Sequence, residues 1–389
     1  MNDQVERFVE DRRDEMVALL SRLVAAKTVN PPGDEHLAAE IMRDALESVG
    51  IKCTAFEKEP GRTNMVAQVG SGRPKILVAC HFDVVPPGDG WETDPFAAVV
   101  RDGRVWGRGT CDNKGQLAAM LEIARLLKQN EDRLIGEVIL VGAADEECGS
   151  GLGLEWMADE GMLDADFGLI PDIDNGMKEI SVAEKGAFFL KITANGRQAH
   201  GSTPEKGINA AWLMIDLLGE VRQMKLDFAP DPLFTPPTRN LGLISGGSAP
   251  NVVPGQCEAQ MDFRFLPSQS AEEIEQAVRA AGSRIEEANE GASFTFERMM
   301  EVDPMRIDPA NPLVRRLQDK AAAVLGWRPQ LKGLSGSTVA KPLVRVGIPA
   351  VGFGPGEESQ AHAANESIAV DELLNFAKVL GTFLIKEES

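Results

Sequence analysis

The 389-residue sequence contains no tyrosine, so no mechanism can use a tyrosine as an acid. No apolar run approaches the ~18 residues that a membrane-spanning helix requires, and the first residues lack the apolar core of a signal peptide. The five cysteines have no disulfide-framework spacing; they are Cys53, Cys80, Cys111, Cys148 and Cys257. These absences predict a cytoplasmic protein with reduced thiols and no membrane segment.

Basic residues are also scarce, with 40 Lys and Arg against 60 Asp and Glu and a formal net charge of −20. This excess of negative charge argues against nucleic acid or an anionic membrane as a partner. It does not imply a cationic substrate, because a sum over the chain does not describe any one pocket. The length exceeds that of one ordinary core, so we expect two domains.

An apolar run at 75–80 is typical of a buried strand and leads directly into His81 and Asp83. The prolines at 86 and 87 cannot continue a sheet. Ligands of open α/β sheets bind beyond the carboxyl ends of the strands, so both side chains should face a cleft. Alternate strand residues point to one side, so Asp83 could accept the second ring N–H of His81 and fix its tautomer for metal binding. A turn contact without metal is the alternative.

Acidic residues follow three further predicted elements. Asp112 lies in a glycine-rich loop, 107–115, that leads into a helical pattern at 116–128. This loop is neither G-x-G-x-x-G nor a P-loop, which disfavours a nucleotide site. Glu146 and Glu147 follow the apolar strand 134–143, where a solvated loop with capping acids is the alternative. Asp172 follows a further short strand.

The alternation of strands and helices predicts an α/β fold with a mixed, largely parallel sheet flanked by helices. The four strand ends should then meet at one edge of this sheet. The pattern changes between 185 and 298, where strands and two helices form an inserted α+β domain, so residues 1–184 and 299–389 make up the other domain. One histidine with several carboxylates suits zinc, manganese or cobalt better than a calcium cage.

Four motifs in this order closely resemble the co-catalytic zinc peptidase and deacylase family, which includes acetylornithine deacetylase, succinyl-diaminopimelate desuccinylase, aminoacylase and glutamate carboxypeptidase. The motifs are His81-x-Asp83, Gly109-Thr-Cys-Asp112-Asn-Lys-Gly115, Asp145-Glu146-Glu147-x-Gly149-Ser150 and Gly354-Pro-Gly followed by His362-x-x-Asn365-Glu366. The resemblance covers essentially the whole chain. It implies two zinc ions per subunit, replaceable by cobalt or manganese, with the ligands His81, Asp112, Glu147, Asp172 and His362.

In this resemblance Asp112 bridges the two metals, and a water or hydroxide shares the bridge. Glu146 is the general base that takes the water proton and returns it to the leaving amine. Asp83 is then the partner that orients His81. Asp174 is the alternative ligand to Asp172, two residues further along.

The resemblance also implies that the inserted domain mediates a homodimer and closes over the site. His200 would donate a hydrogen bond to the tetrahedral oxyanion, often from the neighbouring subunit, although a loop histidine at a domain interface is the alternative. Asn251 and Arg264 match a polar pair that holds a substrate carboxylate. Gly354 would line the substrate cleft through its backbone.

The sequence departs from the family pattern at two places. The loop Gly333–Lys341 lacks the acid that many deacylases carry, and Asp172 replaces a more frequent glutamate, as in several dipeptidase-like members. The resemblance as a whole leads us to expect a zinc-dependent hydrolase of an N-acyl amino acid. Asp172 makes a metallo-dipeptidase or carboxypeptidase the alternative. A non-hydrolytic relative would lack Glu146 or a ligand, and none is missing.

Overall fold

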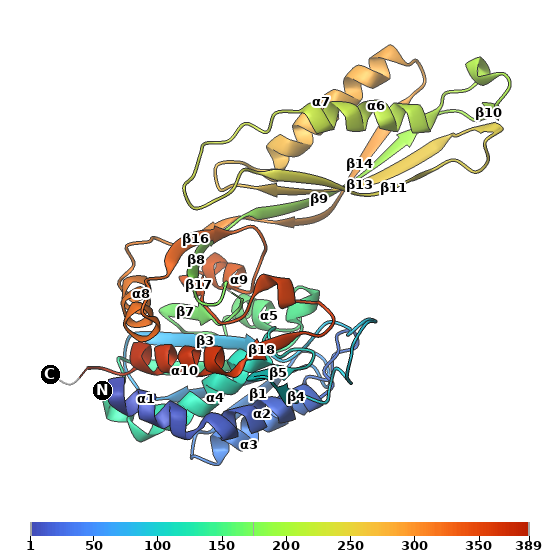
Figure 1. The fold of residues 1–389 in the computed structure, drawn as a ribbon. Coiled ribbons are helices and arrows are strands. Elements are labelled where there is room, and N and C mark those ends of the chain that lie inside the picture. Colours follow the sequence, from blue (N-terminus) through green and yellow to red (C-terminus); the bar gives the residue numbers. More distant parts are fainter. Residues whose placement is uncertain (1, 174, 388–389) are drawn as a thin grey trace. The chain divides into compact units, whose positions relative to one another are not determined.

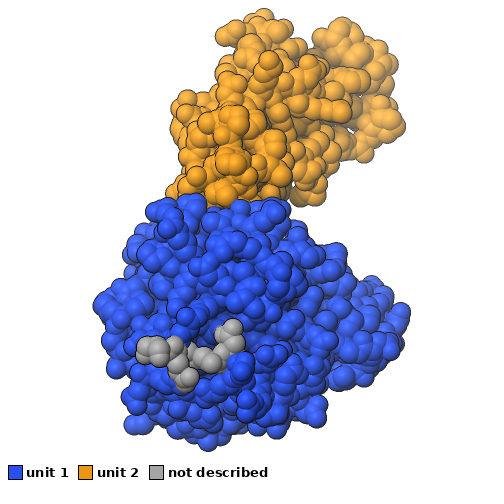
Figure 2. Space-filling view, turned by 60° about the vertical axis from the view of Figure 1, so that its left-hand side comes forward, with its two compact units in different colours: residues 1–182, 307–332, 338–389 blue, residues 183–306, 333–337 orange. Residues whose placement is uncertain are grey.

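The computed structural model describes residues 2–173 and 175–387, which form two compact units (Figure 2). Unit 1 comprises residues 1–182, 307–332 and 338–389, and unit 2 comprises residues 183–306 and 333–337. The sequence placed the borders of the insertion at 185 and 298. In the structure the second border lies at 306 instead of 298. The reason is that strand β14, Ser293–Val302, pairs with β9, Gly186–Asn195, along most of its length.

The largest sheet is mixed, with the strand order β1-β2-β6-β3-β7-β17-β8-β15 and β16 beside β8, and all of its strands except β15 lie wholly or partly in unit 1. The strands are β1 Cys53–Glu57, β2 Thr63–Val69, β3 Lys75–His81, β6 Glu137–Ala143, β7 Phe167–Ile170, β8 Glu179–Glu184, β15 Met305–Arg306, β16 Gln330–Leu334 and β17 Ala350–Gly352. Pairing is parallel in the central strands β6, β3, β7 and β17 and antiparallel at β1–β2, β2–β6, β17–β8 and β8–β15. The predicted fold class is confirmed, with the parallel part confined to the centre of the sheet.

Helices cover both faces of this sheet (Figure 1). The helices of unit 1 are α1 Asn2–Asp11, α2 Arg13–Ala25, α3 His36–Glu47, α4 Lys114–Gln129, α5 Leu154–Asp159, α8 Pro312–Leu325, α9 Ala340–Arg345 and α10 Val370–Leu384. Figure 1 shows α4 and α10 with α1–α3 on one side of β3, and α5 and α9 on the other. The central strands are buried on both sides, which explains their continuous apolar sequences.

A small antiparallel sheet of unit 1 has the strand order β18-β5-β4, with β4 Val99–Arg101, β5 Arg104–Trp106 and β18 Ser367–Ala369. The sequence predicted the hairpin of β4 and β5 from its Asp102-Gly103 turn. β18 adds a strand from near the C-terminus. This pairing brings the segment after His362 next to the glycine-rich loop that follows β5.

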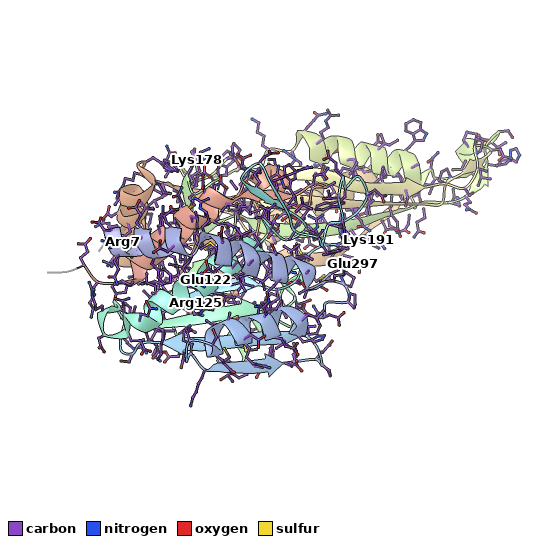
Figure 3. The ribbon with its side chains drawn as sticks, turned by 60° about the horizontal axis from the view of Figure 1, so that its bottom comes forward. Arg7, Glu122, Arg125, Lys178, Lys191 and Glu297 are labelled. Atoms are coloured by element: carbon purple, nitrogen blue, oxygen red, sulfur yellow. The ribbon has the colours of Figure 1, made fainter. Side chains whose placement is uncertain are left out.

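Unit 2 is a four-stranded antiparallel sheet with two helices on one face. Its elements are β9, β10 Ala199–His200, α6 Ala210–Gln223, β11 Thr238–Gly246, β12 Val252–Val253, β13 Gln256–Phe265, α7 Ala271–Ala288 and β14. Alternate residues of β13 are buried against the helices, which is the pattern of a sheet with one covered face. On β9 and β14, Lys191 lies opposite Glu297 (Figure 3). α7 begins with a capping box between Ser270 and Glu273.

Among the described residues, no helix is long and apolar enough to cross a membrane.

Candidate metal centre

The register of the parallel strands brings the predicted site residues of unit 1 to one edge of the sheet. His81, the last residue of β3, pairs with Ala143, the last residue of β6. Val78 of β3 is in register with Leu169 of β7, and Ile170 of β7 is in register with Gly352 of β17. Each strand therefore stops at the same level, and the residues that follow it gather there.

Two histidines and two carboxylates form the centre of this cluster. His81 Nε2 lies 3.1 Å from Asp112 Oδ1, and His362 Nε2 lies 3.3 Å from Asp112 Oδ2. His362 Nε2 also lies 3.1 Å from Glu147 Oε2. Potential ligand atoms of His81, Asp112 and Glu147 all lie within 4.8 Å of one another. Asp112 thus presents one oxygen to each of two imidazoles.

The donor set and its spacing fit zinc or a similar ion. Zinc bonds to nitrogen or oxygen of about 2.0–2.2 Å place two atoms on one tetrahedral ion roughly 3.4 Å apart. The nitrogen–oxygen separations of 3.1–3.3 Å are close to that value. Burial raises the pKa of the Cys80 and Cys111 thiols, which disfavours thiolate ligands. The cluster found among the described residues contains no cysteine.

Two carboxyl groups at the centre are difficult to ionise without a cation. Burial raises the pKa of Asp172 to about 6, and the negative charge of Asp112 contributes to this shift. Burial also raises the pKa of Glu146 well above its usual range, opposed by His81 and reinforced by Asp172, Asp112 and Glu147. A bound cation would relieve this repulsion, because it favours the ionised form of every nearby carboxylate.

The two imidazoles show the complementary behaviour. Hydrogen bonds to Asp112 and Glu147 raise the pKa of His362 to about 10. Burial would lower the pKa of His81, but Asp112 and Asp83 outweigh burial and raise it well above the usual value. For Asp112, burial is outweighed by His362 and His81, and its pKa lies well below the usual range. In this arrangement protons on the imidazoles occupy the places that metal ions would take.

Asp83 contacts His81 Nδ1 through both its backbone and its side chain. Its backbone carbonyl oxygen lies 2.9 Å from His81 Nδ1, and its carboxylate Oδ1 lies 3.5 Å away. The carboxylate also accepts the backbone N–H groups of Glu146 and Glu147, each at 3.1 Å. Asp83 therefore links the strand end of His81 to the two adjacent glutamates.

A buried polar network behind Asp83 was not identified from the sequence. Asn30 donates to Asp83 Oδ2 at 2.9 Å and to Asp145 Oδ1 at 3.1 Å. Arg62 donates to both oxygens of Glu35, at 2.7 and 2.8 Å, and to Asp145 at 2.8 Å. Asp145 has a φ of 64°, which a non-glycine residue seldom adopts. The network fixes this residue immediately before Glu146. Only the break at Asn30-Pro-Pro marked this region in the sequence, and it gave no indication of the partners.

Asp172 lies where β7 ends, beside the segment that follows β17. Its carboxylate Oδ1 accepts the N–H of Ile173 at 2.7 Å. Gly354 packs against it so closely that a Cβ at this position would lie 2.1 Å from the carbonyl oxygen of Asp172. The structure thus gives Gly354 a packing role beside the predicted ligand. The alternative ligand, Asp174, lies outside the described residues.

The remaining candidates lie in unit 2. The N–H of Ser202 donates to Nδ1 of His200 at 3.1 Å, so this nitrogen carries no proton and Nε2 carries it. His200 pairs with Val252 across β10 and β12, and the N–H of Gly201 donates to the Asn251 carbonyl at 2.8 Å. Arg264 on β13 forms two hydrogen bonds with the carboxylate of Asp262, at 2.8 and 3.1 Å. His200 and Asn251 are neighbours, while the guanidinium of Arg264 is engaged by an acid of its own strand.

Comparisons with known proteins agree with these observations. Residues 77–386 match Peptidase family M20/M25/M40. A succinyl-diaminopimelate desuccinylase of Gluconacetobacter diazotrophicus is 30% identical over 387 residues, which covers 95% of this chain and 96% of the relative. An acetylornithine deacetylase of Shigella sonnei is 31% identical over 309 residues, with 78% of each chain covered.

The fold is similar to that of solved peptidases. The crystal structure of aminopeptidase PepT from Bacillus cereus superimposes with a TM-score of 0.78 at 23% identity, covering 96% of this chain and 98% of that chain. This likeness concerns the fold. The two relatives above, each at 30% identity or more, support the family.

Proposed function

Because the chain belongs to Peptidase family M20/M25/M40, we propose that it is a metal-dependent hydrolase that cleaves the amide bond of an N-acyl amino acid. The observation that carries this proposal is the position of Asp112, which presents one carboxylate oxygen to each of two imidazoles. A carboxylate placed in this way suits a bridge between two cations. The named relatives, a desuccinylase and a deacetylase, support a small acylated amino acid as the substrate.

We assign two zinc ions to this centre, with cobalt or manganese as substitutes. His81 and Asp172 complete one site, Glu147 and His362 complete the other, and Asp112 belongs to both. Such a pair of ions would polarise the scissile carbonyl and lower the pKa of the attacking water to roughly 7. The nitrogen and oxygen donors of the cluster support this set of ligands.

Glu146 acts as the general base in this proposal. It is adjacent to a proposed ligand, yet it is itself left without a metal, and bound cations would keep its carboxylate ionised and able to accept a proton. It takes the proton of the attacking water and delivers it to the leaving amine. The hydrogen bonds from the N–H groups of Glu146 and Glu147 to Asp83 hold the backbone of both glutamates in place.

His200 supplies the hydrogen bond to the oxyanion. Its Nε2 carries the proton because the N–H of Ser202 donates to Nδ1, so the ring is a hydrogen-bond donor at Nε2. We assign Asn251 and Arg264 to the substrate carboxylate, for which Arg264 must exchange its contact with Asp262. Gly354 lines the cleft through its backbone.

A dipeptidase or carboxypeptidase is the second candidate. It is favoured by Asp172, which stands where deacylases more often have glutamate. In either case we expect a cytoplasmic homodimer that forms through unit 2.

The test compares two adjacent glutamates. Glu146→Gln should reduce hydrolysis at least ~100-fold while the protein still binds two zinc ions, because a general base is lost and no ligand is. Glu147→Gln should lose one of the two ions. Turnover of N-acetyl, N-succinyl and dipeptide substrates, measured beside the zinc content, checks both statements. Normal turnover by Glu146→Gln would refute the mechanism, and preferred cleavage of dipeptides would select the second candidate.

A further inference from the structure

We propose that the buried ion pair of Arg108 and Glu366 holds the ligand loops of the metal centre and so sets the affinity for the cation shared by Asp112, Glu147 and His362. This inference rests on the proposed metal centre and assigns two residues that are not ligands. Arg108 and Glu366 lie 2.7 Å apart, with side chains 2% and 0% exposed. An ion pair so fully removed from water persists only where additional hydrogen bonds satisfy both groups.

Glu366 receives those hydrogen bonds from the glycine-rich loop. Its Oε2 accepts from Arg108 at 2.7 Å and from the N–H of Gly109 at 2.9 Å. Its Oε1 accepts from the N–H of Cys111 at 2.7 Å and from the N–H of Asp112 at 3.1 Å. The carboxylate therefore has two donors on each oxygen, which makes it an anchor for the loop and not a metal ligand. Three of these donors are backbone groups at or just before Asp112.

Arg108 extends the clamp to the other ligand segments. Its guanidinium donates to the carbonyl oxygens of Ala363 at 3.2 Å and of His362 at 3.3 Å. It also donates to the carbonyl of Pro87 at 3.3 Å, in the loop that follows His81 and Asp83. One side chain thus ties three separate parts of the chain together, and the planar fork of arginine suits several fixed acceptors.

The segment around His362 depends on this clamp more than the rest of the centre does. His362 has a φ of 59°, an uncommon conformation for a residue with a side chain, and its side chain is 55% exposed. Asn365 shares this conformation, with a φ of 59°, and accepts the N–H of Glu92 at 2.8 Å. By contrast, His81 ends a central strand whose ladder fixes its position. Asp112 belongs to both sites, but loss of the clamp also frees the segment of His362, so it should weaken the site of His362 more than the site of His81 and Asp172.

The experiment titrates metal-free protein with Zn²⁺ and with Co²⁺ against a competing chelator. For the wild type we expect two bound ions. Glu366→Gln replaces an oxygen acceptor by an NH₂ group that faces backbone donors, and we expect the affinity for one ion to fall by ~10–100-fold while the other changes by less than ~3-fold. The visible spectrum of the Co²⁺ protein should lose the contribution of the weaker site alone. Arg108→Lys, which keeps the charge but loses the fork, should show the same selective loss to a smaller degree.

Glu122→Gln is the matched control. Glu122 on α4 is also a buried glutamate paired with an arginine, since Arg12 donates to it at 3.0 Å, but it does not belong to the clamp. This variant should keep both affinities. Equal weakening of both ions in the Arg108 and Glu366 variants, or no weakening in either, would overturn the inference. A wild-type protein that binds no ions would instead refute the proposed function itself.

Discussion

At the scale of single residues, environment separates side chains of the same type. Glu146 and Glu147 are neighbours in sequence, and Asp83 holds the N–H groups of both. Glu147 lies 3.1 Å from His362, where a shared cation would neutralise it. Burial, together with the neighbouring carboxylates, raises the pKa of Glu146. The different roles that we propose for the pair follow from these surroundings.

The His362 ring leads to a prediction about metal binding. Hydrogen bonds to Asp112 and Glu147 raise the pKa of His362 to about 10, so this ring carries an additional proton at pH 7.5 in the metal-free protein. A metal ligand must be neutral imidazole, so zinc binding should release at least one proton per chain. Calorimetric titration with zinc at pH 7.5, in two buffers of different ionisation enthalpy, measures this number.

Protonation of the ligands also determines how zinc affinity changes with pH. As the pH falls below 7, Asp172, with a pKa of about 6, also becomes protonated, so zinc affinity should decrease steadily toward pH 5. Equal apparent enthalpies in the two buffers, or an affinity that does not change between pH 5 and 7.5, would contradict the assignment of these residues as ligands.

A residue could be predicted where the neighbouring sequence indicates its position in the fold. His81, Asp112, Glu147 and Asp172 follow apolar strands or precede a helix, so their positions could be inferred from sequence alone. Arg62 could not be, because it is recognisable only by its partner Glu35, 27 positions away, and by Asp145. Long-range ion pairs leave no periodic pattern in a sequence.

At the scale of elements, the register of β3, β6, β7 and β17 turns separate motifs into one site. The buried central strands were predictable because they are continuously apolar. β14 was missed because it lies at the edge of its sheet with most of its residues outside the core. α9 was missed because it has only six residues and contains Pro342. Exposed or short elements lack the apolar periodicity on which such predictions depend.

The close approach of β17 to β7 gives a prediction for Gly354. Gly354→Ala would place a Cβ 2.1 Å from the carbonyl oxygen of Asp172, so the end of β7 must move. We expect the metal-free protein to lose about 1–3 kcal/mol of stability and the enzyme to lose zinc from the site of His81 and Asp172. Denaturant unfolding and zinc content measure the two effects.

Gly219→Ala is the control for this substitution. Gly219 lies inside α6, where an added Cβ meets nothing within 4 Å, so alanine should be neutral or stabilising. A Gly354→Ala protein with unchanged stability and full zinc content would show that β17 does not position Asp172.

At the scale of the whole molecule, the chain leaves unit 1 and returns to it. The proposed ligands extend from His81 to His362, so unit 1 cannot assemble its centre until the segment beyond unit 2 has been added. The change of pattern after 184 made the insertion visible in the sequence, since alternating strands replaced the earlier strand–helix order. The sequence could not show which strands lie at the edges of the unit 2 sheet, because an edge strand differs from an inner one only in its pairing partners.

The final prediction concerns β11, an edge strand of this sheet. Among the described residues β11 pairs only with β13, and it exposes Leu243 by 61% and Ile244 by 51%. An exposed apolar edge strand can pair with a second copy, so we expect a dimer through this strand.

Leu243→Lys, which adds a charge there, should shift the mass measured by light scattering from two chains toward one. Val100→Lys on β4, a residue 54% exposed in unit 1, should leave the dimer intact. If Leu243→Lys stays dimeric, or the wild type is a monomer at micromolar concentration, β11 is not the interface.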